Sequence, residues 1–282
     1  MNAAKVTGWV VGYLCTLSGC TDSGAVSEGH AKAHVKELAK AVSTDVGEVR
    51  RGLPLGALCM GAFFNRPSLG PEQASDARDA LAKCQNKVQD LRVAKSTFFA
   101  AATADGTVLR NDREQDLMAG KSLFGAYPEL RQALTHGYVE TEGSMPEASG
   151  VKGKPDAQWV AGSPVKVDGQ VRGLYATGWS WSAYAYRLEF ALRSSVRGGV
   201  TEQQKEPLVY VFVVSGKHAY GAPVSPRVSA QAVEQLNPLA TATEQTPFST
   251  HLEITGRTFG LAVIRTPSLG KNVGIAVLRS ET

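Results

Sequence analysis

The chain has 282 residues, which is enough for one large or two modest domains with a buried core and too long for a small disulfide scaffold. Hydrophobic residues make up 43% and charged residues 20%, which is typical of a soluble globular protein and excludes both wholesale disorder and a polytopic membrane protein. The 30 Lys and Arg against 26 Asp and Glu leave a net charge of only +4, and the basic residues are scattered. Because a nucleic-acid binder concentrates its positive charge, we expect no DNA or RNA partner.

The N-terminus has the pattern of a secretory signal. One cation, Lys5, precedes an apolar run from Val6 to Leu17. A run of about 12 residues is the length of a signal-peptide core, whereas a permanent membrane span needs about 20. We therefore expect residues 1–19 to be removed as a signal peptide; an uncleaved anchor or a short buried helix is the alternative.

The apolar run ends in Leu17-Ser18-Gly19-Cys20, which resembles the lipobox of bacterial lipoproteins. The resemblance implies cleavage before Cys20 and a diacylglycerol on its thiol, with acyl chains holding the protein at a membrane. Thr21 stands where the aspartate retention signal of inner-membrane lipoproteins would be. We expect a lipid anchor, outer membrane favoured, on a chain that faces the periplasm. Residues 20–29 are small and polar, and we expect them to form a flexible tether.

Two cysteines remain after the signal is removed and Cys20 is acylated. These are Cys59 and Cys84, an even pair in a compartment that permits disulfides. A bridge between them is one expectation on these grounds. Two buried free thiols are an equal alternative, because free cysteine is among the most buried residue types.

Residues 30–94 have the pattern of a helical region. Val35, Leu38 and Val42 begin an apolar stripe with spacings of three and four that continues to Val49, which predicts a helix of about twenty residues from His30. Residues 52–73 are rich in Gly and Pro and are expected to interrupt it. A second helix is predicted over 75–91.

Two histidines on the first helix have the spacing of a metal site. His30 and His34 lie four residues apart, as two ligands on one helix face would. No third ligand is close in sequence, and both lie off the apolar stripe. We therefore expect a solvated helix face and no metal.

The rest of the chain contains a faint repeat, in which each copy has two strands, a helix and then antiparallel strands. In the first copy, residues 95–181, we predict strands at 96–102, 107–110, 157–167 and 170–181 and a helix at 127–136. A linking helix and hinge occupy 182–206. In the second copy, residues 207–282, we predict strands at 208–215, 218–222, 249–254, 258–265 and 273–279 and a helix at 229–236.

The repeat resembles a known family of extracytoplasmic sensors. The resemblance is carried by the long first helix, by FFAAATADGTVLRND (98–112), by the helix that opens at Tyr127-Pro128 and by AGSPVKVDGQVRGLYATG (161–178). Together they are similar to the double-Cache module, whose units are PAS-like. The resemblance implies an α+β fold, with a long N-terminal helix followed by two PAS-like antiparallel-sheet units.

The resemblance also implies a ligand and a place for it. Cache ligands are small molecules of the amino acid, carboxylate or amine class, held between the sheet and the loops over it. By analogy the pocket of the first unit would use Arg110 for a carboxylate, Asp112 for an amine, and Trp159 and Tyr175 as walls. The alternative is that Arg110 and Asp112 cap a hairpin and that both aromatic rings are core. The mostly aliphatic strands of the second copy favour the first copy as the binding unit.

The segment GWSWSAYAYRLEF gathers aromatic residues where the last strand of the first copy meets the linking helix. Trp179, Trp181, Tyr184 and Tyr186 can brace the junction between the copies or form a patch that binds a partner. Bracing is the interpretation that we favour.

No catalytic motif stands out. Ser-x-x-Lys, the nucleophile and base spacing of penicillin-recognising enzymes, lacks its companion elements at all three of its occurrences, Ser149/Lys152, Ser163/Lys166 and Ser268/Lys271. We expect a binding module without a cofactor rather than an enzyme, with a periplasmic hydrolase as a minor alternative. No kinase or methyl-accepting segment follows the second copy, so we expect signalling through a separate envelope protein. A non-catalytic envelope scaffold is the other alternative.

Overall fold

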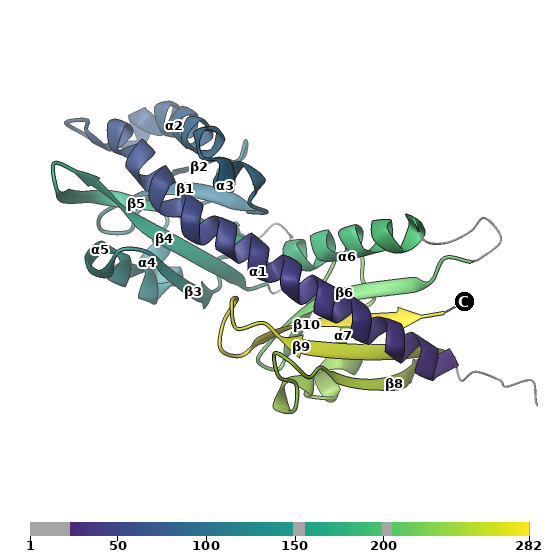
Figure 1. The fold of residues 1–282 in the computed structure, drawn as a ribbon. Coiled ribbons are helices and arrows are strands. Elements are labelled where there is room, and N and C mark those ends of the chain that lie inside the picture. Colours follow the sequence, from purple (N-terminus) through teal and green to yellow (C-terminus); the bar gives the residue numbers. More distant parts are fainter. Residues whose placement is uncertain (1–22, 149–155, 199–204, 282) are drawn as a thin grey trace, which may run out of the picture.

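The computed structural model describes residues 23–148, 156–198 and 205–281. Cys20 and the predicted signal peptide lie outside the described residues. The described chain forms two α+β units that share one long N-terminal helix, as Figure 1 shows.

The helices and strands follow the predicted order. The helical region contains α1 (Ser23–Phe64), η1 (Pro71–Gln73), α2 (Ala74–Lys87) and α3 (Gln89–Val93). The first unit contains β1 (Phe98–Thr103), β2 (Val108–Asn111), α4 (Leu123–Ala126), η2 (Pro128–Gln132), α5 (Ala133–His136), β3 (Val139–Gly143), η3 (Pro146–Ala148), β4 (Gln158–Val167) and β5 (Gln170–Ser180). Helix α6 (Trp181–Gly198) leads to the second unit, which contains β6 (Leu208–Ser215), β7 (His218–Gly221), α7 (Arg227–Gln235), η4 (Pro238–Ala240), β8 (Phe248–Ile254), β9 (Arg257–Arg265) and β10 (Val273–Ser280).

The two sheets have the same topology. The first has the strand order β2-β1-β5-β4-β3 and the second β7-β6-β10-β9-β8, with every neighbouring pair antiparallel. The predicted repeat is therefore confirmed, and all nine predicted strands lie within two residues of their observed ends. Strand β3 was missed, and Trp181 begins α6 instead of ending β5.

Helix α1 is much longer than the sequence predicts. It contains 42 residues and crosses one face of each sheet, with its N-terminal end over β8 to β10 and its C-terminal end over β4 and β5 (Figure 1). The apolar stripe continues past Val49 through Leu53, Ala57 and Met60. The predicted interruption at 52–73 is therefore wrong as far as Phe64, because burial of this stripe outweighs the loss of a backbone donor at Pro54.

The glycines of this segment serve close packing rather than a turn. A Cβ on Gly56 would lie 2.4 Å from Cε1 of Tyr175, and one on Gly52 would lie 2.8 Å from Cδ2 of Leu91. Glycine lets α1 approach β5 and α3 at these two points.

The predicted tether is also helical where the structure describes it. Residues 23–29 form the first turns of α1, and Ser27 is buried against β9, where a Cβ on Gly260 would lie 2.1 Å from the amide nitrogen of Glu28. The Glu28 carboxylate accepts a hydrogen bond from the hydroxyl of Ser249 at 2.7 Å. These partners lie more than 200 residues away in sequence, so local composition could not reveal them.

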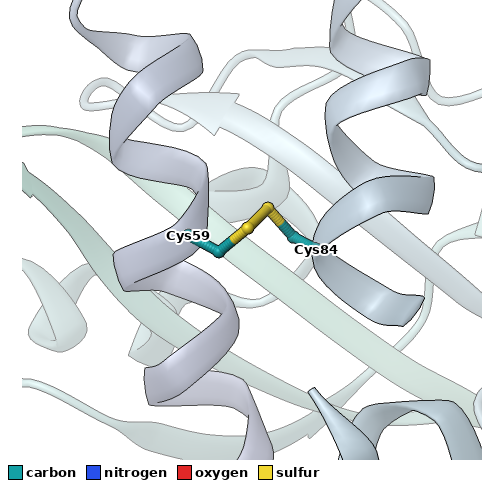
Figure 2. Close-up of a disulfide and its surroundings, with 2 residues drawn as sticks. All are labelled: Cys59 and Cys84. Carbon is teal, nitrogen blue, oxygen red and sulfur yellow. A yellow bond between two sulfur atoms is a disulfide. The ribbon is translucent and has the colours of Figure 1, made fainter. Parts of the chain in front are cut away.

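Each sheet is covered on both faces. One face packs on α1, with α2 and α3 beside the first sheet and α6 beside the second. The opposite face is covered by α4, η2 and α5 in the first unit and by α7 and η4 in the second. Cys59 of α1 and Cys84 of α2 form a disulfide, which joins the two helices (Figure 2).

The aromatic residues at the start of α6 brace the junction. The ring of Trp179 stacks between those of Trp159 and Tyr184, with centroid distances of 4.3 Å and 4.9 Å. The hydroxyl of Tyr184 then donates to the Asp45 carboxylate of α1 at 2.8 Å. This arrangement agrees with the bracing interpretation, although Tyr186 points outward and is 50% exposed.

The two histidines of α1 contact the end of β10. The ring of His30 lies 2.7 Å from the carboxylate of Glu281, and Nε2 of His34 lies 2.6 Å from the guanidinium of Arg279. The expectation of a solvated helix face is therefore wrong for His34, which is mostly buried. No group of three His, Cys, Asp or Glu side chains in the described part of the chain is placed to hold a metal ion.

Candidate functional site

The two faces of the first sheet differ in character. Phe99 and Ala101 of β1 point toward α1, whereas Phe98, Ala100 and Ala102 point toward α4, η2 and α5. This alternation follows from the two-residue period of a strand. A small ligand can lie between the sheet and its loops only on a face that α1 leaves free.

Trp159 and Tyr175, which the sequence proposes as pocket walls, lie on the face toward α1. Both are fully buried. Tyr175 stacks on Phe99 with a centroid distance of 5.8 Å and lies directly beneath Gly56. Burial raises the pKa of the Tyr175 phenol, whose oxygen has no hydrogen-bond partner among the described residues. In this structure both rings are packed as core.

Arg110 lies within β2, and Asp112 directly follows that strand. Arg110 lies opposite Ala101, which in turn lies opposite Tyr175, so its side chain starts from the same face of the sheet. Its guanidinium forms an ion pair with Asp116 at 3.2 Å. Asp112 accepts a hydrogen bond from the amide of Phe99 at 2.8 Å, and burial raises the pKa of its carboxyl group.

These contacts fix residues 111–118, which we call the rim loop. Arg110 also donates to the backbone carbonyls of Arg113 and Glu114, at 2.9 and 3.3 Å. The Asp116 carboxylate, whose side chain is 2% exposed, accepts from the amides of Asn111 and Met118. Asp116 is not among the residues predicted from the sequence, although Asn and Asp closely following a strand are typical of side chains that hold a turn.

The rim loop forms one wall of a cavity of about 430 Å³ on the face away from α1. The other walls come from the start of β1, from η3 and from the start of α6. None of the four residues proposed from the sequence lines this cavity, which is lined by Thr97, Phe98, Asn111, Arg113, Glu114, Gln115, Leu117, Met118, Glu147, Ala148 and Ala183. Charges of both signs therefore surround an apolar floor.

Two buried polar groups position the opposite walls. The side-chain oxygen of Gln158 accepts from the Tyr127 hydroxyl at 2.8 Å and from the amide of Met145 at 2.7 Å, directly before η3. Asp156 accepts from the amide of Ser182 in the first turn of α6 at 3.3 Å, and burial raises the pKa of its carboxyl group. A carboxylate at a helix N-terminus satisfies amides that lack partners within the helix.

The second unit has its own cavity on the equivalent face. It measures about 670 Å³ and lies between the β6–β7 hairpin and α7, with Arg227 and Glu234 among its lining residues. The Glu234 carboxylate is already engaged by the amide of Ala219 at 2.9 Å.

Ser-x-x-Lys gains no support as a catalytic pair. Ser163 and Lys166 lie within β4, and Ser268 and Lys271 lie in the turn after β9. Ser149 and Lys152 lie outside the described residues.

No family model matches the sequence, and no curated protein matches it. Solved structures do match. An extracellular ligand-binding receptor from Desulfohalobium retbaense has a TM-score of 0.51 at 14% identity, over 90% of this chain and 40% of that chain. This chain therefore spans less than half of that receptor.

Two further structures match over nearly their whole length. A methyl-accepting chemotaxis protein X has a TM-score of 0.51 at 15% identity, over 92% of this chain and 98% of that one. A domain of a sensory box/GGDEF family protein from Vibrio parahaemolyticus has a TM-score of 0.55 at 10% identity, over 93% and 98%. These likenesses show a shared fold.

Among the described residues, no helix combines the length and the apolar character needed to cross a membrane. The architecture is one long helix along two five-stranded sheets of identical topology. The chain therefore has the tandem PAS-like, Cache-type α+β fold that its sequence resembles, and it shares this fold with extracellular receptor and sensory domains.

Proposed function

We propose that this protein is an extracytoplasmic sensory module that binds a small molecule in its first unit. The observation that carries the proposal is the cavity between the rim loop, β1, η3 and α6, because it combines charged groups of both signs with an apolar floor. Ligand sites are concave and largely apolar, with a few polar groups that fix orientation. The shared fold with receptor domains supports the same class of function.

The lining residues favour a zwitterion, such as an amino acid, over a simple anion or cation. Arg113 can hold a carboxylate through two parallel N–H groups, and Glu114 and Glu147 can accept from an ammonium group. Phe98 and Met118 would contact an apolar side chain. A ligand with only a carboxylate or only an amine would contact some of these groups and would bind more weakly than a zwitterion.

Arg110 and Asp112 take a supporting role in this proposal. Arg110 holds the carbonyls of Arg113 and Glu114, and Asp112 ties the same loop to β1. Trp159 and Tyr175 would support the sheet from its other face. The ligand would thus contact the rim loop itself and not the four residues that the sequence singled out.

The proposal includes a lipid anchor and a separate signalling partner. The lipobox-like segment ending in Cys20 supports a lipoprotein that faces the periplasm, with the outer membrane favoured because Thr21 follows the cysteine. Signalling through another envelope protein is part of the same proposal.

A thermal-shift screen of amino acids, organic acids and amines tests the binding function. A true ligand stabilises the folded state by about 2.7 kcal/mol at a hundredfold excess over Kd. Arg113→Ala should abolish the shift, and Arg92→Ala, which removes an exposed cation from α3, should leave it unchanged. The proposal fails if no compound shifts the folded protein, or if both variants bind as the wild type does. A stoichiometric envelope partner without any ligand would favour the scaffold alternative.

A further inference from the structure

We propose a second binding site, for a small oxyanion with two or more negative charges, in the groove between α1 and the second unit. The groove measures about 840 Å³. Lys36, Lys40 and Ser43 of α1 line one side, and Thr266 and Ser268, which follow β9, line the other. The site is separate from the cavity of the first unit, with which it shares no lining residue.

The groove carries an excess of positive charge. Its lining contains four cations, Lys36, Lys40, Arg50 and Arg265, and a single carboxylate, Glu244. Clefts lined by one sign of charge attract ligands of the opposite sign. The composition therefore selects an anion over an amine or a neutral ligand.

Three of these four cations have no carboxylate partner in the described chain. Arg50 forms an ion pair with Glu140, at 2.6 Å. The guanidinium of Arg265 instead donates to backbone carbonyls, including those of Ala242 at 2.9 Å and Lys271 at 3.0 Å. Carbonyl oxygens orient a guanidinium without neutralising its charge.

The two lysines on α1 are the exposed cations of the helix side of the groove. Lys36 and Lys40 lie four residues apart, so they project from the same side of the helix. Neither forms an ion pair with a described residue. Two ammonium groups on one helix face can bind the same ligand.

Buried hydroxyl groups provide the second observation. Thr266 is only 3% exposed, and its Oγ1 has no hydrogen-bond partner in the described chain. The Oγ of Ser268 is likewise buried and unpartnered. A buried polar group without a partner is unfavourable, so each hydroxyl would gain from an acceptor that reaches it from the groove, which both residues line. A carboxylate or phosphate oxygen is such an acceptor, whereas an ammonium group is not.

An anion in this groove would act on the junction of the two units. Arg50 reaches from α1 to Glu140 of β3 and also to the carbonyl of Ser268 at 3.4 Å. A ligand in the groove would therefore contact α1 and the second unit next to Arg50, which links both of them to the first sheet. This placement suits a regulatory anion that sets how firmly the units are held together.

Calorimetric titration of the full-length protein with citrate, inorganic phosphate and pyrophosphate tests the site, at an ionic strength held constant with chloride. We expect at least one of the three to bind. Lys36→Gln with Lys40→Gln should weaken that binding by about tenfold or more, since each lost charged hydrogen bond is worth roughly that factor. Lys83→Gln with Lys87→Gln, an equally spaced pair on α2, should change it by less than about twofold.

Thr266→Val adds a test that does not alter charge. The variant keeps the shape of the side chain and removes an unpartnered hydroxyl, so the melting temperature of the free protein should not fall while the affinity for the anion does. Arg113→Ala should leave the binding intact, which separates this site from the first-unit cavity. The inference is overturned if none of the three anions binds, or if the α2 pair weakens binding as much as the α1 pair.

Discussion

The hydroxyl of Ser215 donates a hydrogen bond to the carboxylate of Glu142 across the junction of the two units, with 2.8 Å between the oxygens. Glu142 belongs to the edge strand of the first sheet and Ser215 to the last position of β6. Burial raises the pKa of Glu142, and the Ser215 hydrogen bond offsets only part of this effect. Ionisation of Glu142 therefore lowers the stability of the junction.

Glu142→Gln should stabilise the protein at neutral pH. Because folding raises the pKa of Glu142, its contribution to stability is fully present below the pKa of the unfolded chain and is lost as the pH rises through the folded-state pKa. Gln retains an acceptor for Ser215 and carries no charge, so we expect a gain of about 1 kcal/mol or less at pH 7.5 and none near pH 4. Chemical denaturation at the two pH values measures it.

A second glutamate on the same strand provides the control. Glu140 receives two hydrogen bonds from Arg50, at 2.6 and 2.9 Å, and one from the Tyr138 hydroxyl at 2.7 Å. Glu140→Gln should therefore lower stability at neutral pH, opposite in sign to Glu142→Gln. If both substitutions changed the stability by the same amount and in the same direction, the different roles given to Glu140 and Glu142 would be contradicted.

Two glycines of α1 should respond oppositely to alanine. At Gly56 the new Cβ would overlap the ring of Tyr175, and we expect Gly56→Ala to destabilise the protein by about 1–3 kcal/mol. At Gly29 no atom lies within 4 Å of the new Cβ, and we expect Gly29→Ala to stabilise by about 0.5–1 kcal/mol because alanine favours the helix. Thermal unfolding of both variants measures these two stability changes. A loss of stability in Gly29→Ala would argue against a helix over 23–29.

Arg110→Ala should loosen the rim loop. The side chain of Arg110 is 15% exposed, and its guanidinium supports the buried carboxylate of Asp116 together with two loop carbonyls. We expect a loss of about 2 kcal/mol, and faster amide hydrogen exchange at Arg113 and Glu114. Arg92→Ala on the surface of α3 should stay within about 0.5 kcal/mol of the wild type. Unchanged amide hydrogen exchange in the rim loop of Arg110→Ala would contradict the proposed role of Arg110 in holding this loop.

The link between Cys59 and Cys84 should be detectable chemically. Non-reducing peptide mapping should show both cysteines in one fragment, and quantitative alkylation without reductant would rule the link out. Replacing both with serine should cost about 3 kcal/mol, since the bridge closes a loop with a sequence separation of 25.

The anchoring prediction concerns Cys20. Mass spectrometry of the mature protein should show an N-terminal Cys20 that carries acyl chains. An intact Met1, or an unmodified Cys20 in protein extracted from membranes, would contradict the lipoprotein assignment.

The repeat could be predicted because strands and turns leave local signals. The nearly continuous apolar runs of β9 and β10 are features of a few neighbouring residues, and so is the Asp168-Gly169 turn between β4 and β5. Strand β3 could not be found in this way, since Val139 is followed by Glu, Thr and Glu, and all its residues are only half-buried. Edge strands take their stability from one neighbour and need little apolar character.

The candidate site was harder to predict for a different reason. Tyr175 and Leu174 are adjacent in sequence but point to opposite faces, and only the position of α1 decides which face is covered. The sequence offered large aromatic residues as pocket walls, yet their size made them the natural filling beneath a helix. The cavity-lining residues Arg113, Glu114 and Gln115 carry no pattern that distinguishes them from ordinary surface residues.

Helix α1 also determines how the molecule unfolds. Its buried stripe belongs to one apolar cluster that includes Trp159 of the first sheet and Val213 and Ile275 of the second. Neither unit has a complete core without the part of α1 that covers it, and both parts belong to one uninterrupted helix. We therefore expect the two units to unfold together. A chain divided between them would leave an uncovered apolar stripe on the half that keeps α1 and an uncovered sheet on the other.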